Sequence, residues 1–279
     1  MKWQGRRGSR NIVDRRRMSG GTAGIGGVGL LVILAIGYFA GIDVTPILNE
    51  VSQSQRGGGE VTEEDERAAQ FVSVTLADTE EVWAGIFDRQ VDGPYDPPTL
   101  VLYQNVTQSA CGGASGATGP FYCPGDGSIY LDADFFVTME RQLGAGGDFA
   151  AAYVVAHEVA HSVQDQLGIL SEANRLRSQS SQAQSNAISV RIELQADCFS
   201  GIWARQAEAQ FGSLDPGDIS EAMNAARQIG DDTLQRNAGR VPMPHTFTHG
   251  TSEQRQRWFA TGYETGDLRA CDTFNTQDL

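Results

Sequence analysis

One short segment limits the folds open to this chain more than any other. Residues 150–164 read AAAYVVAHEVAHSVQ, an apolar run with Gly147 before it and Gly168 after it. This pattern predicts one buried helix over residues 148–167. His157 and His161 stand at positions i and i+4 of that helix, one above the other, so both imidazoles can reach a single metal ion. The fold must therefore bury a helix that carries two histidines on one face.

Glu158 completes the pattern H-E-x-x-H. It lies about 100° around the helix from His157, so its carboxylate is expected to approach a metal-bound water rather than the metal. Zinc lowers the pKa of such a water toward about 7, and Glu158 would accept the proton that the water releases. A pattern this short also arises by chance in unrelated sequences. The two histidines are half of the four in the chain, which favours a functional site over a chance match.

A third ligand must come from elsewhere, because a hydrolytic zinc site has three protein ligands and one position for water. The best candidate is Glu193, in a second apolar helix that reads RIELQADCFSG over residues 191–201. Asp197 lies one turn further along the same face and is expected to accept the Nδ1 hydrogen of a ligand histidine. Asp197 and His245 are the alternative third ligands, and His245 is otherwise interpreted as a loop residue.

The N-terminal region differs sharply from the rest. Residues 1–17 have seven basic residues and one acidic residue, a net charge of +6, and residues 18–42 have no charge at all. A helix over 18–42 would be long enough to cross a bilayer. A cleaved signal peptide and a buried core helix are the alternatives, and the length of the run favours an uncleaved anchor. The basic segment is then expected in the cytoplasm and the remainder outside it.

The rest of the chain is acidic. The full chain has a net charge of −14, so the residues after position 17 together carry −20. Nucleic acid is excluded as the main partner, because contacts to phosphates need clustered arginine or lysine. Residues 43–61 are polar and rich in glycine, which is typical of a flexible linker, and the folded domain is expected over 62–279.

The four cysteines suit two disulfides in an oxidising compartment. A Cys111–Cys123 bridge would close a loop rich in glycine and serine, and Cys198 and Cys271 would then pair by elimination. Four buried free thiols are the alternative. None of the cysteines forms a C-x-x-C zinc pair.

Periodicity predicts a mostly helical α+β domain with a small sheet. Thr62 is the expected N-cap of one helix or two over 62–90, with Asp65 in the acidic first turn. Strands are predicted at 99–103 and 128–131, and they form a small sheet or a hairpin. The remaining predicted helices cover 132–143, 148–167, 171–211 with a break, 215–237 and 251–262.

Three motifs carry a resemblance to a known family: HEVAH at 157–161, ELQAD at 193–197 and HGTSEQR at 249–255. With GPFYCP at 119–124 and IYLD at 129–132, they resemble the bacterial putative neutral zinc metallopeptidase family, from the basic segment to Cys271. More distantly, the chain resembles the gluzincins of the CAAX prenyl protease and HtpX-like group, which implies a zincin-like fold.

In that distant group a late histidine, followed six positions later by an arginine, assists the reaction. His249 and Arg255 keep this spacing, with Gly250 where the group has proline. The resemblance therefore implies catalytic roles for both: a neutral His249 would donate a hydrogen bond to the developing oxyanion, and Arg255 would orient it or hold a substrate carboxylate. A loop residue before the last helix is the alternative interpretation of His249.

The expected function is that of a zinc metallopeptidase anchored in the bacterial membrane, with Glu158 as general base. A peptide or protein substrate is implied by the resemblance. A non-catalytic zinc-binding or chaperone-like envelope module is the first alternative, and an intact Glu158 counts against it. A zinc hydrolase of a non-peptide amide is the second.

Overall fold

The histidine-bearing helix α5 (Asp148–Gln166) runs through the centre of the protein, in a computed structural model that describes residues 1–16, 61–91, 93–115 and 118–279. Its side chains are buried on almost every face from Phe149 to Ala160. Such a helix needs neighbours all round. They are α3 (Glu63–Gln90), α6 (Ile169–Ser178), α7 (Gln182–Phe211), α8 (Asp218–Gln228) and strands of a small sheet.

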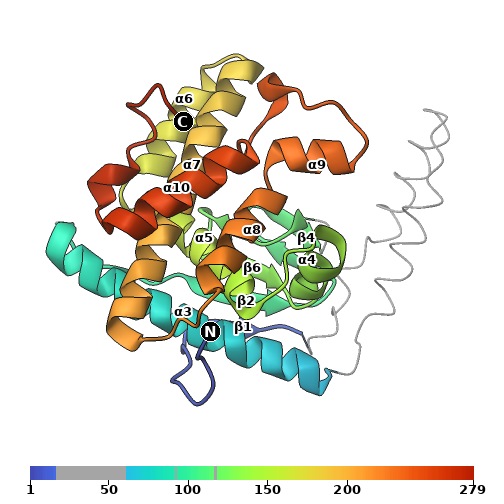
Figure 1. Cartoon of the computed structure of the whole chain (residues 1–279), viewed down its shortest axis with the longest axis vertical. Helices are drawn as coiled ribbons and strands as arrows, with labels where there is room; N and C mark the ends of the chain where they lie inside the picture. Colours follow the sequence, from blue (N-terminus) through green and yellow to red (C-terminus); the bar gives the residue numbers. More distant parts are fainter. Residues whose placement is uncertain (17–60, 92, 116–117) are drawn as a thin grey trace.

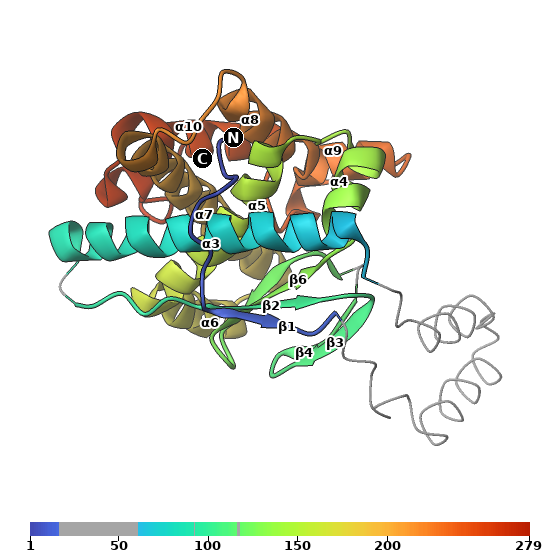
Figure 2. The same ribbon diagram turned by 90° about the horizontal axis from the view of Figure 1, so that it is seen from below.

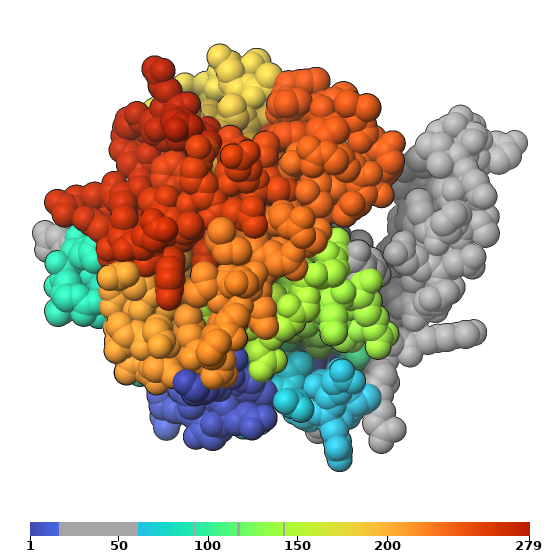
Figure 3. Space-filling model, viewed as in Figure 1, coloured from blue at the N-terminus to red at the C-terminus, as the bar shows by residue number. Residues whose placement is uncertain are grey.

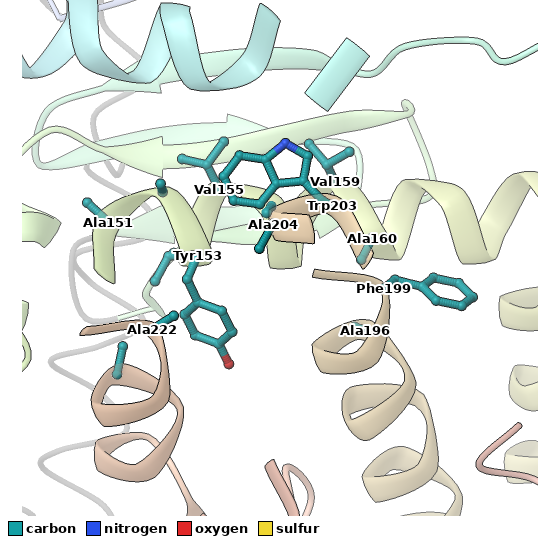
Figure 4. Packing of buried hydrophobic residues seen from close by; sticks show 14 of the residues in the cluster. Ala151, Tyr153, Val155, Val159, Ala160, Ala196, Phe199, Trp203, Ala204 and Ala222 are labelled. Atoms are coloured by element: carbon teal, nitrogen blue, oxygen red, sulfur yellow. The ribbon is translucent and has the colours of Figure 1, made fainter. Parts of the chain in front are cut away.

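A large part of the hydrophobic core lies where α5 meets α7. The indole ring of Trp203 lies beside Val155 and Val159 of α5, while the Tyr153 ring points to another side of the helix (Figure 4). Trp203 also stacks on Phe149, with ring centroids 5.7 Å apart. Full burial of large apolar side chains stabilises the fold by about 1.5–3 kcal/mol each. These contacts fix α5 and α7 relative to each other, and these two helices carry the candidate metal ligands.

Local sequence signals set where the long helices begin and end. Thr62 and Asp65 form the capping box that starts α3, as predicted, and α3 is one continuous helix. Ser181 and Gln184 start α7 in the same way. Gly212 ends α7 in the left-handed conformation, with φ of 56°, which only glycine adopts without strain. In the view of Figure 2, α3 runs across the molecule with α8 and α10 on one side of it and the strands of the sheet on the other.

The main sheet has the strand order β1-β2-β6-β5, in which β1 is Ile12–Asp14. The two predicted strands are present as β2 (Thr99–Tyr103) and β6 (Ser128–Asp132), and they are parallel neighbours rather than a hairpin. β5 (Phe121–Cys123) pairs antiparallel with β6 and forms an edge of the sheet beside α5. β3 (Val106–Ser109) and β4 (Gly112–Ser115) form a separate hairpin, of which Figure 1 labels β4 and Figure 2 labels both strands.

The other helices differ from the prediction mainly in their breaks. The predicted break in 171–211 is confirmed, between α6 and α7. The single helix predicted over 215–237 is two, α8 and α9 (Asp231–Asn237), because the backbone at Gly230 is extended, with φ of −67° and ψ of 140°. A Cβ atom at Gly230 would collide with the backbone of Ser252. The remaining elements are α4 (Phe135–Leu143), α10 (Ser252–Thr265) and the short 3-10 helices η2 (Pro244–Thr246) and η3 (Leu268–Cys271).

Helices α7 and α10 pack backbone against backbone at two glycines. A Cβ atom at Gly201 would overlap the carbonyl oxygen of Phe259, and one at Gly262 would overlap that of Cys198. The contact brings α10 close enough for Arg255 to reach into the centre of the protein, where its side chain is 2% exposed.

Both predicted disulfides are confirmed. Cys111 is joined to Cys123, and Cys198 is joined to Cys271. The second bridge ties the C-terminal segment to α7, close to the candidate ligands. Disulfides are typical of an oxidising compartment.

The first 16 residues belong to the folded domain. β1 (Ile12–Asp14) is a parallel neighbour of β2, and the backbone N–H of Lys2 donates to the carbonyl of Ser213. Trp3 is buried against Phe71, and the N-terminal residues lie against the body of the protein in the space-filling view (Figure 3). The predicted location, with residues 1–17 in the cytoplasm and the catalytic domain across a membrane, is therefore wrong, because a strand shares the compartment of its sheet.

The predicted transmembrane anchor is not supported. Within the ranges described above, no helix is both long enough and apolar enough to cross a membrane. The apolar run 18–42, and residues 43–60 of the predicted linker, lie outside the described residues.

Candidate metal centre

Three side chains from two helices meet at one point. His157 and His161 come from successive turns of α5, and Glu193 comes from α7. Nε2 of His157 lies 3.1 Å from one carboxylate oxygen of Glu193, and Nε2 of His161 lies 3.6 Å from the other. One ligand atom from each residue falls within 4.8 Å of the others, a spacing that suits one ion at their centre.

The far nitrogen of each imidazole is held by a different acceptor. Nδ1 of His157 lies 2.9 Å from Oδ1 of Asp197, and Nδ1 of His161 lies 2.8 Å from Oε1 of Gln164. Gln164 is fixed in turn, because its Nε2 donates to the carbonyl of Ile192 and to Oε1 of Gln195. Both acceptors favour the tautomer with hydrogen on Nδ1.

This arrangement fits a cation. With hydrogen on Nδ1, each neutral imidazole presents only a lone pair at Nε2, and the Glu193 carboxylate also presents only lone pairs. Three sets of lone pairs would repel one another unless a positive charge lies between them. Two imidazole nitrogens and one carboxylate oxygen are a donor set that zinc accepts in catalytic sites.

Asp197 is the centre of a buried polar group behind His157. Arg255 binds its carboxylate through two nitrogens, at 2.7 and 2.9 Å, and the Tyr153 hydroxyl donates to Oδ1 at 2.5 Å. Burial raises the pKa of the Asp197 carboxyl, but the Arg255 charge and the His157 hydrogen bond outweigh it and lower the pKa below its usual value. Asp197 therefore stays ionised and acts as a fixed acceptor for His157.

The pKa of His157 is likewise shifted by opposing effects. Burial lowers it, but hydrogen bonds to Asp197 and Glu193 raise it, to about 10. Two carboxylates on opposite edges of the ring therefore favour a positive charge at this position. A proton supplies that charge when no metal is bound.

Glu158 borders a cleft of about 760 Å³ that also contains the three candidate ligands. Its side chain comes from the same turn of α5 as His157. No described residue holds the Glu158 carboxylate in a hydrogen bond or ion pair, so it is available to a ligand in the cleft. The edge strand β5 lines the same cleft through Phe121 and Tyr122, and the Tyr122 hydroxyl donates to Asp165 of α5.

His249 lies in the loop before α10 and also lines the cleft. Asp231, the first residue of α9, accepts the backbone N–H groups of Thr248, His249 and Gly250 with one oxygen. Its other oxygen lies 3.2 Å from Nδ1 of His249, and this hydrogen bond raises the pKa of His249. The loop is thus fixed to α9.

The structure brings most of the predicted site residues together. His157, His161, Glu193, Asp197 and Glu158 are adjacent, and His249 lies in the same cleft. Arg255 is at the floor of the cleft, where Asp197 and Tyr153 hold its guanidinium. His245 is exposed in η2 and is not part of the cluster.

Sequence reasoning missed three residues of the site: Tyr153, Gln164 and Asp231. Gln164 had a usable signal, a polar side chain three residues after His161 on an apolar helix. Tyr153 lies one turn before His157 and would have been found by the same search. Asp231 had no usable signal in the sequence, because it is 18 residues from His249 and the two residues meet only through the fold of a loop.

Comparisons with known proteins agree with this geometry. Residues 1–274 match the family described as "Putative neutral zinc metallopeptidase". The uncharacterized protein YpfJ of Escherichia coli is 46% identical over 287 aligned positions, covering 98% of this chain and 99% of that protein. The uncharacterized proteins Mb2605 of Mycobacterium bovis and Rv2575 of Mycobacterium tuberculosis are each 43% identical over 195 positions, about two thirds of either chain.

No solved structure matches the chain significantly. The family match covers nearly the whole sequence, including every residue of the His157, His161 and Glu193 cluster, and a zinc site is what the family description implies. The chain therefore belongs to the putative neutral zinc metallopeptidase family.

Proposed function

We propose that this protein is a zinc-dependent peptidase in which His157, His161 and Glu193 hold the metal and Glu158 is the general base. One observation carries the proposal: one candidate ligand atom from each of these three residues converges within 4.8 Å, beside a carboxylate that borders a cleft and has no partner among the described residues. A bound zinc ion supplies a Lewis acid and lowers the pKa of a coordinated water to about 7.

Glu158 has the placement that a base needs. Glu158 as a whole residue is 8% exposed and lines the cleft, so a proton that its carboxylate accepts stays shielded from bulk water. It is next to His157 in the sequence, and the helix turns its side chain away from the ligand face. Glu158 would take a proton from the attacking water and pass it to the leaving amine.

His249 is proposed to stabilise charge that develops on the substrate carbonyl. Asp231 accepts only, so it favours hydrogen on Nδ1 of His249. For Nε2 to donate to an oxyanion as well, the ring must be the doubly protonated imidazolium, which Asp231 also favours. This differs from the neutral donor expected from the sequence. A fixed donor of this kind stabilises the transition state more than the ground state.

Arg255 is proposed to act through Asp197 as a positioning residue. Its side chain is 2% exposed and its guanidinium is bound to Asp197, so a substrate carboxylate would have to displace that contact. Arg255 instead keeps Asp197 ionised and oriented, and Asp197 orients His157.

The test is hydrolysis of casein and of a peptide library by zinc-loaded protein. Glu158→Gln should retain zinc and lose at least about 100-fold in activity, because general-base catalysis contributes about that much. His157→Ala and His161→Ala should each lose stoichiometric zinc, measured by elemental analysis. His245→Ala is the matched control, since that histidine is exposed outside the cluster, and it should retain both.

Each contrary result has a distinct meaning. Zinc at the wild-type level in both cluster variants would contradict the site. Zinc binding without hydrolysis of any peptide would contradict a peptidase and leave a binding module or a hydrolase of another amide. Wild-type activity in Glu158→Gln would contradict the assigned base.

A further inference from the structure

The cleft has a positive side chain that the proposed chemistry does not use. Arg177, near the end of α6, lines the cleft together with Asn174 and Ser189. The only other arginine among the described residues that line it is Arg255, whose charge is already paired with Asp197. Arg177 thus leaves one uncompensated cation at the cleft wall.

Arg177 is held by neutral groups only. Its Nη1 donates to Oδ1 of Asn174 at 3.2 Å, and its Nε donates to the Ser185 hydroxyl at 3.4 Å. No described carboxylate lies within 4.0 Å of it. Arg175, two residues earlier on the same helix, differs: it binds Glu172 through two nitrogens. The two neutral contacts orient the Arg177 guanidinium without neutralising it.

The register of α7 places this cation relative to the metal ligands. Ser185, Ser189 and Glu193 follow at intervals of four residues and so share one face of the helix. Eight residues span about 12 Å along an α-helix, so Arg177, bound at Ser185, lies about that far from Glu193. An extended peptide covers about 3.3 Å per residue. The distance corresponds to three or four residues of a bound chain.

Ser189 lies between these two points on α7, and apolar side chains line the cleft beside it. Leu170 of α6 and Ile192 of α7 pack in one cluster, and Phe121 of β5 lines the cleft as well. A guanidinium without an acidic partner, in a cleft with apolar lining, suits a carboxylate, since arginine binds one through two parallel hydrogen bonds. Asn174 adds donors, because its amide nitrogen is not used by Arg177.

We propose that Arg177 determines specificity by binding a carboxylate of the substrate, three or four residues from the bond that is cleaved. The carboxylate belongs either to an aspartate or glutamate side chain or to the C-terminus of the peptide. This inference rests on the proposed peptidase function and names the substrate class: peptides with a negative charge at that distance from the scissile bond.

The experiment compares matched peptides on the full-length, zinc-loaded protein. One series has Glu, Gln or Lys at each of positions two to five on either side of the cleaved bond. A second series ends in a free carboxylate or in an amide. The wild type should prefer Glu to Gln at one position, or the free carboxylate to the amide, by about tenfold or more in kcat/KM, the range of a charged hydrogen bond. The preference should lie mainly in KM, because the contact is remote from the reacting bond.

Substitutions then assign the preference to Arg177. Arg177→Gln should abolish it, and Arg177→Glu should reverse it toward Lys. The ratio between matched peptides cancels any general loss of folding. Arg175→Gln is the control on the same helix and should keep the wild-type ratio. An unchanged Glu-to-Gln and acid-to-amide ratio in Arg177→Gln would overturn the proposal.

A binding measurement separates this proposal from the proposed activity. The same peptides, labelled with a fluorophore, are titrated against zinc-loaded Glu158→Gln protein, which should bind without cleaving. Tenfold tighter binding of the acidic peptide, lost when Arg177→Gln is added, supports the carboxylate site even if no peptide is hydrolysed by the wild type. Equal binding of acidic and neutral peptides overturns it, whatever the activity.

Discussion

The carboxylate of Asp197 lies 2.9 Å from Nδ1 of His157, on the opposite edge of the imidazole ring from Glu193. The two acids are one helical turn apart on α7, yet they have different surroundings: Asp197 is fully buried and binds Arg255, while Glu193 is part of the cleft wall. Their positions on the ring therefore favour Glu193 as the candidate metal ligand and Asp197 as the acceptor that orients His157.

The first prediction separates these two acids by zinc affinity. Glu193→Gln should weaken zinc binding most, because a neutral amide is a poor ligand for a divalent ion. Asp197→Asn should weaken it about 10- to 100-fold, the usual effect of losing the acceptor of a ligand histidine. Competition with a chelator measures both. If Asp197→Asn lost the metal and Glu193→Gln kept it, the two roles would be reversed.

The same pair should show the opposite order in stability. Asp197→Asn leaves the charge of Arg255 buried without its partner, which destabilises a protein by about 3–5 kcal/mol. Glu193→Gln removes a charge that faces the cleft and should destabilise the metal-free protein less. Urea denaturation of both metal-free variants tests this. Equal free energies of unfolding would show that Arg255 does not depend on Asp197.

A second relationship, between Asp231 and His249, predicts how activity depends on pH. The hydrogen bond that Nδ1 of His249 donates to Asp231 raises the pKa of His249, so the imidazolium persists to higher pH than in a free histidine. Its contribution to catalysis is complete below that pKa and is lost as the pH rises through it. Asp231→Asn lowers the pKa, so activity should decline from a lower pH.

The measurement is kcat/KM against pH for both proteins. His249→Ala should lose about 100-fold in kcat without a comparable loss of zinc, since one oxyanion donor contributes about that much. Asp232→Asn is the control, because that acid binds Ser252 and Arg236 rather than the histidine. An alkaline limit that stays in place in Asp231→Asn would contradict the role given to His249.

Local patterns were enough to predict the helices that form the candidate metal site. Helix α5 was predicted within one residue of its observed ends, because its apolar run and flanking glycines are local signals. Glu193 was placed at the site for a similar reason, as an acid on a second apolar helix. The side chains that hydrogen-bond to the ligands or to Asp197 were harder to predict. Gln164 and Tyr153 acquire their partners only when α5 packs on α7.

The sheet was predicted only in part. β2 and β6 are apolar and were found, whereas β1 has three residues in an arginine-rich segment and its partner, β2, lies more than 80 residues away. A strand so short has no periodicity to read, and the charge pattern around it favoured a cytoplasmic segment instead. The error in location follows directly from that missed pairing.

A fourth prediction tests whether the N-terminal residues belong to the fold. Trp3 is 4% exposed, packs edge-on against Phe71 and donates its indole N–H to Asp148, the first residue of α5, at 2.9 Å. Trp3→Ala should destabilise the protein by about 3–5 kcal/mol, the usual effect of removing a buried indole. Val13→Ala, on the exposed face of β1, should change stability by less than about 1 kcal/mol.

Denaturant unfolding of the two variants gives the comparison. A Trp3→Ala protein as stable as the wild type would mean that residues 1–16 do not pack on the domain. That result would also remove the reason for placing them in its compartment.

The last prediction concerns the glycines at which α7 and α10 touch. Because a Cβ atom at Gly201 or Gly262 would overlap a backbone carbonyl of the other helix, alanine at either position must push the helices apart. Overpacking of this kind destabilises a protein by about 1–3 kcal/mol or more. Gly85, within α3, is the matched control. A Cβ atom there meets only the flexible end of Arg89, so Gly85→Ala should stabilise the helix by about 0.5–1 kcal/mol.

The displacement should also reach the metal site. Arg255 lies two turns before Gly262 on α10, and it keeps its contact with Asp197 only if α10 stays in place. Gly262→Ala should therefore weaken zinc binding, measured by chelator competition, while Gly85→Ala leaves it unchanged. If Gly262→Ala were destabilised but bound zinc with wild-type affinity, the position of Arg255 would not matter for the ligands, and Asp197 alone would orient His157.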